Sequence, residues 1–366
     1  MASLDICYVV NAVGAGSIPA EIATAVTRHT DHTVDILTWF DTSSFAGDDT
    51  VTVDSVAAPD TPLGIDRATY HRAVNYLDGY DLVQTHHNHS GAFAKVIARR
   101  LGIPVVSREG NTRDGFTRKG RIANGVTNPL ASRIVCISES VYASFTDWER
   151  AILPKRKVTT IPNGVHLDRI DSTASALPEG VPAHEDAFLV GNAAMMYEQK
   201  AQDTLIRAVG ELNSRVGRPV ELVVCGDGPE RERLMSLAVR HDISERVHFL
   251  GLVERETVYA TCKAVDAFAM PSRWEGFCSA VAEALAARTP TVLSDIDVFR
   301  ELYDDAALFH EVDDVAGLTD ALTKLVDDSD ERDRLARAGR RLVEERYTIE
   351  AVATQYGELY DQIVDQ

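Results

Sequence analysis

The sequence predicts an α/β protein built from two doubly wound domains. Short apolar runs alternate with amphipathic segments almost from end to end, and this alternation is typical of βαβ units with parallel sheets. The runs are too numerous for one ordinary open sheet, and an eight-stranded barrel would space them more regularly. The length of 366 residues is sufficient for two domains that each bury a core.

The apolar runs predict strands in both halves of the chain. In the first half the strands are expected at 4–10, 33–38, 50–54, 81–85, 103–107, 132–138 and 157–162. In the second half they are expected at 186–192, 219–225, 246–250, 265–270, 290–294 and 306–311. Helical spacing of apolar residues predicts helices at 17–29, 90–101, 200–214, 229–241, 277–288 and 331–346.

A segment rich in small, polar, Pro and Gly residues divides the chain at 167–185. We therefore predict an N-terminal domain at 1–166, a linker at 167–185 and a C-terminal domain at 186–347. The tail at 348–366 repeats apolar residues at helical spacing, as at Val352, Tyr356 and Tyr360. This tail is expected to form a final helix.

The chain is strongly acidic, with a net charge of −19 and a pI near 5.0. Such a charge argues against nucleic acid as the main partner. Asp (33) exceeds Glu (23), and only seven of the 37 cations are Lys. This composition suggests a salt-adapted protein, although a GC-rich genome would also favour Arg over Lys.

The five cysteines are widely spaced and include no C-x-x-C pair. No disulfide framework or zinc site is therefore predicted, which favours a reducing, cytoplasmic environment. No basic segment precedes the first apolar run, so a signal peptide is not expected. No uninterrupted apolar stretch is long enough to predict a membrane span.

The most informative segment is PSRWEGFCSAVAEALAARTPTV, which contains Glu275 and Glu283. It predicts a buried strand ending at Pro271-Ser272, a loop with one carboxylate, and a helix that carries the second. A helix N-terminus suits a phosphate group, and carboxylates accept hydrogen bonds from sugar hydroxyls. The segment therefore favours a nucleotide-sugar site, while the bare spacing of the two glutamates also fits two solvated helix carboxylates.

This segment resembles the donor-site signature of retaining glycosyltransferases with the GT-B fold, specifically glycosyltransferase family 4. The resemblance covers most of the chain and is strongest in the C-terminal half. It implies two Rossmann-like domains facing a cleft, with the donor bound mainly to the second domain and a final helix crossing back to the first. The donor-binding residues it implies there are Lys200, Val253, Arg273, Glu275, Gly276, Phe277, Cys278, Ser279 and Glu283.

The resemblance also implies roles. Lys200 matches a lysine that neutralises charge on the leaving nucleoside diphosphate. Glu283 is expected to hold the ribose and Glu275 the sugar hydroxyls, and both Lys200 and Glu275 count as catalytic candidates. Val253 ends the run FLGLV, which is similar to the loop that borders the nucleotide base.

One cation of the implied phosphate clamp is missing. Where the family usually has an arginine, five residues before Lys200, this chain has Met195. Arg273 is a candidate substitute, and an ordinary exposed loop arginine is the alternative. This departure leaves an unusual donor or weakened activity open.

In the first domain, Gly14 and Gly16 follow the first predicted strand, at the end where doubly wound sheets bind ligands. The resemblance implies that this loop approaches the donor phosphates. His86 matches the family's strand-end histidine and is expected to orient the acceptor or touch the donor sugar. Gly110 stands where the family often has a histidine, so Glu109 or Asn111 is expected to take over acceptor recognition, with His86 and Glu109 as further catalytic candidates.

No metal site and no cofactor other than the donor co-substrate are predicted. The run THHNHSG carries three histidines, but they alternate around a loop and no carboxylate follows at ligand spacing. The GT-B design implied by the resemblance requires no divalent ion.

Two basic runs, 112–121 and 150–157, contrast with the acidic remainder of the chain. They are either ordinary solvated loops or a face for an anionic membrane surface or a lipid-phosphate acceptor. The second interpretation predicts peripheral contact with the cytoplasmic side of a membrane.

Taken with the resemblance, the sequence predicts an enzyme that moves a sugar from a nucleoside diphosphate sugar to a glycan, lipid or other hydroxyl acceptor, with retained anomeric configuration. Two alternatives stay open, a catalytically weak GT-B scaffold and another sugar-nucleotide enzyme such as an epimerase.

Overall fold

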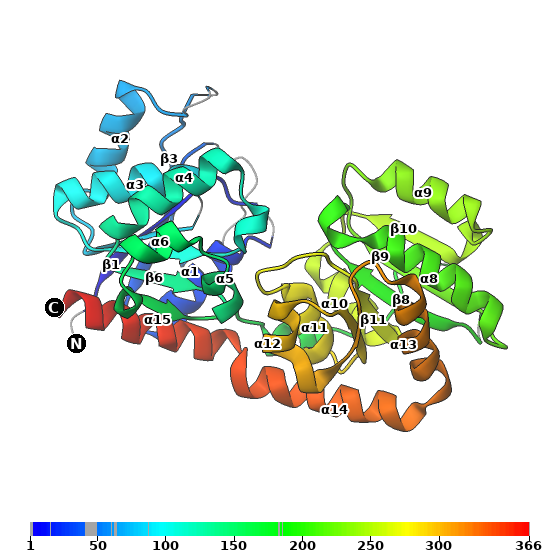
Figure 1. Ribbon diagram of the computed structural model, residues 1–366. Helices are drawn as coiled ribbons and strands as arrows, with labels where there is room; N and C mark the ends of the chain where they lie inside the picture. Colours follow the sequence, from blue (N-terminus) through cyan, green and yellow to red (C-terminus); the bar gives the residue numbers. More distant parts are fainter. Residues whose placement is uncertain are drawn as a thin grey trace. The chain divides into compact units, whose positions relative to one another are not determined.

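The computed structural model of the chain describes residues 3–14, 16–40, 50–59, 61, 64–86, 88–181, 184 and 186–365. The chain divides into two compact units, Met1–Gly164 with Ile349–Gln366, and Val165–Thr348. Each unit is built on one parallel sheet with helices on both faces (Figure 1). The predicted class, α/β with two doubly wound Rossmann-like domains, is confirmed.

The segment expected as a linker, 167–185, belongs to the second unit. It begins with helix α7 (Leu167–Ser172), which packs against the helices α10 (Arg255–Ala264) and α11 (Ser279–Ala286). The tail forms helix α15 (Ile349–Val364) and belongs to the first unit.

The first unit holds a seven-stranded sheet in the order β3-β2-β1-β4-β5-β6-β7. Its strands are β1 (Asp5–Val10), β2 (Thr33–Thr38), β3 (Val53–Ser55), β4 (Leu82–Thr85), β5 (Val105–Glu109), β6 (Arg133–Cys136) and β7 (Val158–Thr160). Its helices, besides α15, are α1 (Ile18–His29), α2 (Arg67–Leu77), α3 (Asn88–Leu101), α4 (Arg118–Thr127), α5 (Glu139–Ala143) and α6 (Asp147–Ile152). Short 3₁₀ turns are η1 (Arg113–Gly115), η2 (Asn128–Leu130) and η3 (Lys155–Lys157).

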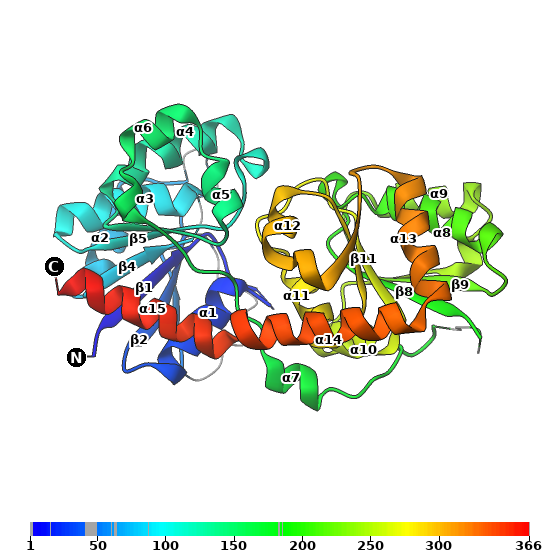
Figure 2. The ribbon, with the colours of Figure 1, turned by 60° about the horizontal axis from the view of Figure 1, so that its bottom comes forward.

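Strand β1 shows why this sheet lies in the interior. All of its residues after Asp5 are buried, which is the pattern of a parallel strand covered on both faces. Its alternate residues Ile6, Tyr8 and Val10 join one apolar cluster with α1 and α15. Helix α3 packs on the sheet, and α2 and α4 pack on α3 (Figures 1 and 2).

Helix α15 is held to the first unit by buried hydroxyl groups as well as by apolar packing. The hydroxyls of Tyr360 and Tyr8 lie 2.6 Å apart, and the Tyr360 hydroxyl donates to Oε1 of Gln84 at 2.8 Å. The Arg108 Nε donates to the Tyr356 hydroxyl at 3.0 Å. These bonds satisfy polar atoms that would otherwise be buried without partners.

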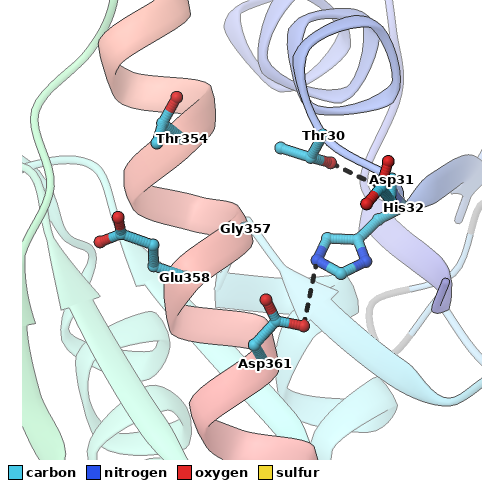
Figure 3. Close-up of a pocket in the computed structure, with 7 residues that line it drawn as sticks. All are labelled: Thr30, Asp31, His32, Thr354, Gly357, Glu358 and Asp361. Carbon is cyan, nitrogen blue, oxygen red and sulfur yellow. Dashed lines mark hydrogen bonds and ion pairs between the residues drawn. The ribbon is translucent and has the colours of Figure 1, made fainter. Parts of the chain in front are cut away.

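The last turns of α15 lie beside the end of α1 around a small polar cavity (Figure 3). There the buried His32 faces Asp361 of α15 at 3.6 Å from Nε2 to Oδ1, and Nδ1 of His32 accepts from the backbone N–H of Leu4. This contact ties α15 to the start of β2.

The second unit holds a six-stranded parallel sheet in the order β10-β9-β8-β11-β12-β13. Its strands are β8 (Phe188–Ala193), β9 (Val220–Cys225), β10 (Val247–Gly251), β11 (Ala267–Met270), β12 (Thr291–Ser294) and β13 (Ala307–His310). Its remaining helices are α8 (Gln202–Arg215), α9 (Arg231–Arg240), α12 (Asp297–Tyr303), α13 (Val315–Asp327) and α14 (Ser329–Arg346), with 3₁₀ turns η4 (Glu198–Lys200), η5 (Ser244–Arg246) and η6 (Asp304–Ala306).

Residues of α8, α9, α13 and α14 share the main apolar cluster of this unit with the sheet. Helices α10 and α11 also pack on the sheet and contact α7. Among the described residues, no helix combines the length and the apolar character needed to cross a bilayer.

Candidate functional site

The loops that follow β8 and β11 meet at the carboxyl edge of the second sheet, because these two strands are neighbours. The backbone N–H of Arg273 donates to the carbonyl oxygen of Gln199 at 2.8 Å, and the Gln199 amide donates to the carbonyl of Trp274 at 2.7 Å. These bonds fix 198–200 against 272–275. Ligands of doubly wound sheets bind at this edge.

Lys200 and Glu275, which are far apart in sequence, form a close ion pair here. The Lys200 Nζ lies 2.5 Å from Oε1 of Glu275, and the hydroxyl of Ser272 donates to the same oxygen at 2.8 Å. Glu275 is buried and Lys200 is largely so. Burial lowers the pKa of the Lys200 ammonium, but the Glu275 carboxylate outweighs this and holds the pKa above its ordinary value. Lys200 is therefore a cation held in place by a fixed carboxylate.

The turn from β11 into α11 has an unusual backbone. Cys278, at the N-cap of α11, has a φ of 66°, in the left-handed region where non-glycine residues are uncommon. Burial and the nearby Glu275 carboxylate raise the pKa of its thiol to about 12, so the thiol stays neutral at physiological pH. The side chain is therefore a neutral filler, and the role of Cys278 in donor binding stays a prediction.

The side chain of Phe277 lies in the interior. Its ring is buried, with edge-on contacts to Tyr303 and Tyr347 at centroid distances of 6.0 and 5.3 Å. The Tyr303 hydroxyl donates to the Phe277 carbonyl oxygen at 2.9 Å. The loop of Gly276, Phe277 and Cys278 is thereby anchored to the core, and Ser279 begins α11.

Glu283 lies in the second turn of α11 and is buried. Its Oε1 accepts a hydrogen bond from Nη2 of Arg255, the first residue of α10. Sequence reasoning missed Arg255, since a cation at a helix start carries no signal until the fold places it beside α11. Ser272 and Gln199 were also missed.

Arg273 pairs with carboxylates other than Glu275. Its Nη2 lies 2.8 Å from Oδ1 of Asp313, its Nε donates to Oδ2 of the same carboxylate at 3.1 Å, and Asp203 lies 3.5 Å from Nη2. Two carboxylates thus compensate its charge. Met195, at the position of the missing arginine, is 40% exposed and supplies no charge.

The loop after β8 lies against the loop after β9 at two glycines. A Cβ at Gly226 would lie 2.0 Å from the Ala194 carbonyl oxygen, and one at Gly228 would lie 2.6 Å from that of Met196. Both glycines also have positive φ, so side chains are excluded on two grounds. Val253 follows β10 and is half-buried between the exposed Leu252 and α10.

In the first unit, Gly14, Gly16 and His86 follow β1 and β4, which are also neighbouring strands. Gly16 has a φ of 71° and stands two residues before α1. The buried His86 ring lies 4.8 Å from that of Tyr8, and its Nε2 lies 3.0 Å from the Gln84 amide nitrogen. His86 is therefore oriented by the sheet itself.

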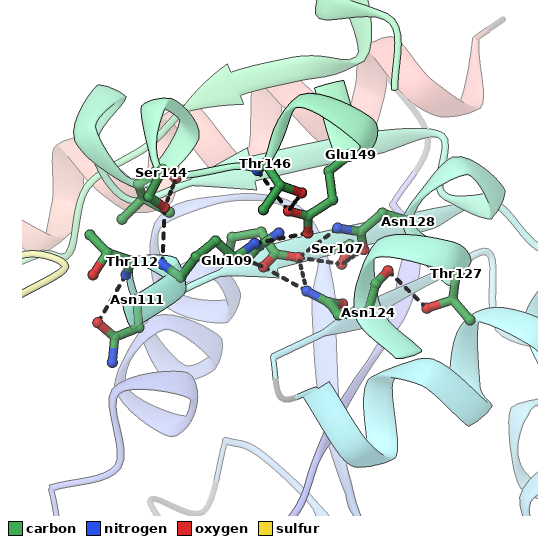
Figure 4. A network of polar contacts seen from close by, with 12 residues as sticks. Ser107, Glu109, Asn111, Thr112, Asn124, Thr127, Asn128, Ser144, Thr146 and Glu149 are labelled. Carbon is green, nitrogen blue, oxygen red and sulfur yellow. Dashed lines mark hydrogen bonds and ion pairs between the residues drawn. The ribbon is translucent and has the colours of Figure 1, made fainter. Parts of the chain in front are cut away.

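Glu109 ends β5 inside a buried polar network (Figure 4). Its Oε2 accepts from Arg113 Nη1 at 2.9 Å, and Asn124 donates to both carboxylate oxygens at 2.8 Å. Asn128 donates to Oε1 at 3.0 Å. Burial raises the pKa of Glu109, but the cations of Arg113 and Lys95 outweigh burial and hold its pKa below the usual range.

The network continues on either side of Glu109. The buried Lys95 donates through Nζ to Asn124 and Asn128 at 2.7 and 2.6 Å. Arg113 also donates through Nε to Glu149 at 2.9 Å and stacks over the ring of Phe145 at 3.8 Å. With both oxygens engaged, Glu109 acts first as a structural anchor for α4, and its part in acceptor recognition stays a prediction.

The predicted residues thus gather at two sheet edges. In the second unit, Lys200, Glu275, Cys278 and Glu283 are near enough to act on one another electrostatically. In the first unit, Gly14, Gly16, His86 and Glu109 follow or end neighbouring strands. Within the described part of the chain, no three His, Cys, Asp or Glu side chains are grouped as a metal site requires.

Fold and site together define a GT-B protein. The family model described as "Glycosyltransferase Family 4" matches residues 14–169, and the one described as "Glycosyl transferases group 1" matches residues 176–342. The chain belongs to these family 4, group 1 glycosyltransferases, as the sequence motifs predicted.

Relatives and solved structures agree with this family. The O-antigen biosynthesis glycosyltransferase WclY of Escherichia coli is 26% identical over 212 residues, which are 58% of this chain and 57% of that protein. The phosphatidyl-myo-inositol mannosyltransferase of Mycobacterium leprae is 32% identical over 208 residues, 56% of this chain and 53% of that protein. The matches thus span little more than half the length of these relatives.

The crystal structure of Anabaena HepE in complex with UDP and glucose is similar over 98% of this chain and 100% of that chain, with a TM-score of 0.80 and 17% identity. At this identity the likeness shows the fold.

Proposed function

We propose that this protein is a retaining glycosyltransferase that takes its sugar from a nucleoside diphosphate donor. The observation that carries the proposal is the ion pair of Lys200 and Glu275 beside the start of α11, with the Glu283–Arg255 pair one helix turn further on. An ammonium and a helix N-terminus favour a diphosphate, and the carboxylates suit ribose and sugar hydroxyls.

In this proposal each group has one task. Lys200 and the backbone N–H groups of 276–279 hold the diphosphate, and Glu275 and Glu283 accept hydrogen bonds from the sugar and the ribose. These contacts stabilise the charge that builds on the departing nucleotide, and such stabilisation usually contributes more to catalysis than any other single effect. Val253 borders the base, and no side chain is assigned as a covalent nucleophile.

The similarity to proteins solved with UDP and UDP-sugars supports a nucleotide-sugar donor, with the identity of the base left to experiment. Relatives named for O-antigen and phosphatidyl-myo-inositol chemistry support a glycan or lipid-linked acceptor. His86 and Glu109 are the proposed acceptor-side groups, and the loop of Gly14 and Gly16 is proposed to approach the donor phosphates. Four of the five free cysteines are buried, in keeping with a cytoplasmic location.

The test is turnover of UDP-, GDP-, ADP- and TDP-sugars, followed as release of the nucleotide with and without a hydroxyl acceptor. Glu275→Gln should lower kcat/KM by roughly 10²–10³-fold for the active donor. The matched control is Glu344→Gln, which removes a half-exposed carboxylate paired with Arg340. Retention is read from the anomeric configuration of the product by NMR.

Two outcomes would favour the alternatives. Epimerised donor without acceptor would indicate a sugar-nucleotide epimerase. No turnover of any donor, together with binding of a partner glycosyltransferase, would indicate a scaffold, an option that Met195 keeps open.

We also propose that the first unit rests on an anionic membrane surface. Helices α4 and α6 lie side by side, since a Cβ at Gly125 of α4 would lie 2.3 Å from the Trp148 ring of α6 (Figures 1 and 2). Each helix exposes two apolar residues at i, i+4 spacing, and their exposed fractions are 50% for Ile122, 60% for Val126, 40% for Trp148 and 45% for Ile152.

Exposed cations accompany these apolar residues, namely Arg118, Lys119 and Lys155, whereas the charge of Arg150 is compensated by Asp147. Arg113, which belongs to the predicted basic run 112–121, is instead buried in the Glu109 network and adds nothing to this face. An apolar patch with a basic rim is the pattern of interfacial membrane contact.

The membrane proposal is tested by flotation with phosphatidylcholine vesicles and with vesicles that also contain phosphatidylglycerol. The double variant Ile122→Ser, Val126→Ser should lower flotation. The control is Met235→Ser, Val239→Ser, which alters an equally exposed apolar pair on α9 of the second unit. Equal flotation of both variants would contradict the proposal.

A further inference from the structure

A second basic feature of the first unit lies at the opposite edge of its sheet from His86 and Glu109. A cavity of about 520 Å³ opens where β6 and β7 begin, lined by Ser132, Arg133, Arg156, Lys157 and Ile363. The amino edge of a doubly wound sheet is not where the ligands of this architecture usually bind. The cavity therefore needs an explanation apart from the proposed donor and acceptor sites.

Main-chain carbonyls orient the cations of this cavity. The Lys157 Nζ donates to the carbonyl oxygens of Pro129 and Ala131 at 3.0 and 2.7 Å, and Nη1 of Arg133 donates to that of Ser132 at 3.1 Å. A carbonyl fixes the direction of a cation without cancelling its charge. Within the described part of the chain, no carboxylate lies within ion-pair distance of Arg156 or Lys157.

The positive charges around this cavity repel one another. Burial lowers the pKa of the Lys157 ammonium, and the nearby Arg156, Arg133 and Arg99 lower it further. Elsewhere in this acidic protein, arginines commonly face carboxylates, as in the pairs Arg215–Asp320 and Arg340–Asp171. Among the described residues, Arg156 and Lys157 have no such carboxylate, and neighbouring cations without one indicate a place where a negative ligand is expected.

We propose that this cavity binds a phosphate-bearing anion. Arg156 offers a guanidinium fork that matches phosphate oxygens, Lys157 adds a point charge, and the Ser132 hydroxyl is available as a hydrogen-bonding group. Ile363 of α15 forms an apolar wall on one side. The phosphate belongs either to a soluble polyphosphate or to the headgroup of an anionic lipid.

The first experiment measures the affinity for pyrophosphate by calorimetry at constant ionic strength. The site proposed for the donor diphosphate would also take pyrophosphate, so the measurement is made in the Lys200→Ala background. Replacing Arg156 by Gln should weaken the remaining binding about fivefold, the effect of losing one cation next to an anion. Arg67→Gln is the control, because Arg67 is an exposed arginine at the start of α2.

Vesicles distinguish the two sources of phosphate. Flotation with phosphatidylglycerol vesicles that falls in Arg156→Gln, while Ile122 and Val126 are intact, assigns the cavity to a lipid headgroup. Pyrophosphate binding that depends on Arg156 without an effect on flotation assigns it to a soluble phosphate.

The proposal is overturned if Arg156→Gln leaves both pyrophosphate affinity and flotation at the level of Arg67→Gln. Nucleotide-sugar turnover does not enter either readout. Failure of the proposed transferase activity and failure of this anion site are therefore separate results.

Discussion

Lys200 and Glu275 illustrate at the residue scale how two buried charges of the proposed donor site hold each other in place. Burying either charge alone would be costly, and each is stabilised by the other. The Ser272 hydroxyl fixes the carboxylate, so the ammonium cannot reorient freely. The proposed diphosphate would therefore meet a cation whose position is already set, and little reorganisation would be needed.

Glu109 gives a stability prediction. Replacing it with Gln removes the carboxylate that acts on the buried Lys95 and leaves Arg113 with Glu149 alone. The loss should be about 3–5 kcal/mol in the free energy of unfolding. Urea denaturation of the wild type and of Glu109→Gln measures it.

The matched control is Asp147→Asn, which breaks a salt bridge to Arg150 in which the aspartate is fully exposed. Its effect should stay near zero. Equal effects of the two substitutions would contradict the structural role of the network.

Lys95 gives a pH prediction. Burial lowers the pKa of its ammonium from 10.5 to about 8, so between these values the unfolded chain holds a proton that the folded chain has released. The cost of burying the charged form is fully present below pH 8 and fades as pH rises. The contribution of Lys95 to stability therefore rises above pH 8, by at most about 1.4 kcal/mol per pH unit.

Unfolding of the wild type and of Lys95→Met at pH 7, 8 and 9 tests this sign. The difference in stability between the two proteins should change between pH 8 and 9 in favour of the wild type. A constant difference across the range would show that Lys95 does not titrate there.

At the scale of elements, strand positions were the most predictable part of the fold. Every predicted strand overlaps an observed one, because parallel strands buried on both faces form continuous apolar runs between turn residues. Helices α4 and α6 were not predicted. The α4 sequence is polar and basic, and α6 has only six residues, so neither shows a long apolar pattern. Helix α4 is held by Asn124 and Asn128 in a network that only tertiary structure assembles.

The candidate site could likewise be predicted only in part. Motif residues such as Glu275 and Lys200 were identified from the sequence, and the structure places them in contact. The partners of Glu283 and Arg273, which are Arg255 and Asp313, come from distant segments. No local pattern marks such a partner, since pairing depends on how the strands are ordered in the sheet.

Helix α15 gives a prediction at this scale. A chain ending at Thr348 lacks seven buried side chains of the first core, and six of them are large, namely Ile349, Val352, Tyr356, Leu359, Tyr360 and Ile363. At about 1.5–3 kcal/mol each, their loss is comparable with the whole stability of a domain. The first unit should then fail to fold while 165–348 remains folded.

Hydrogen exchange followed by mass spectrometry resolves the two units. Amides of 3–164 should lose protection in the shortened chain, and those of 165–348 should keep it. A chain ending at Val364 is the control. Full protection of the first unit without α15 would contradict the assignment of this helix to its core.

At the scale of the whole molecule, the large negative net charge leads to a prediction about stability. A net charge of −19 destabilises the folded chain by self-repulsion, and salt screens this repulsion. The melting temperature should rise by roughly 5 °C between 0.1 and 1 M KCl. Differential scanning calorimetry at several KCl concentrations measures it, and a melting temperature that falls with salt would contradict salt adaptation.

The central claim is that the carboxyl edge of the second sheet binds a nucleoside diphosphate sugar, and thermal-shift measurement with UDP-, GDP-, ADP- and TDP-sugars tests it most directly. A ligand that binds only the folded protein raises its melting temperature. At a ligand concentration a hundredfold above Kd, the free energy of unfolding increases by about 2.7 kcal/mol. We predict a rise with one nucleotide series that disappears in Lys200→Ala and Glu283→Ala and persists in Lys324→Ala, which removes an exposed lysine paired with Glu331. No rise with any series, or a rise unchanged in Lys200→Ala and Glu283→Ala, would contradict the claim.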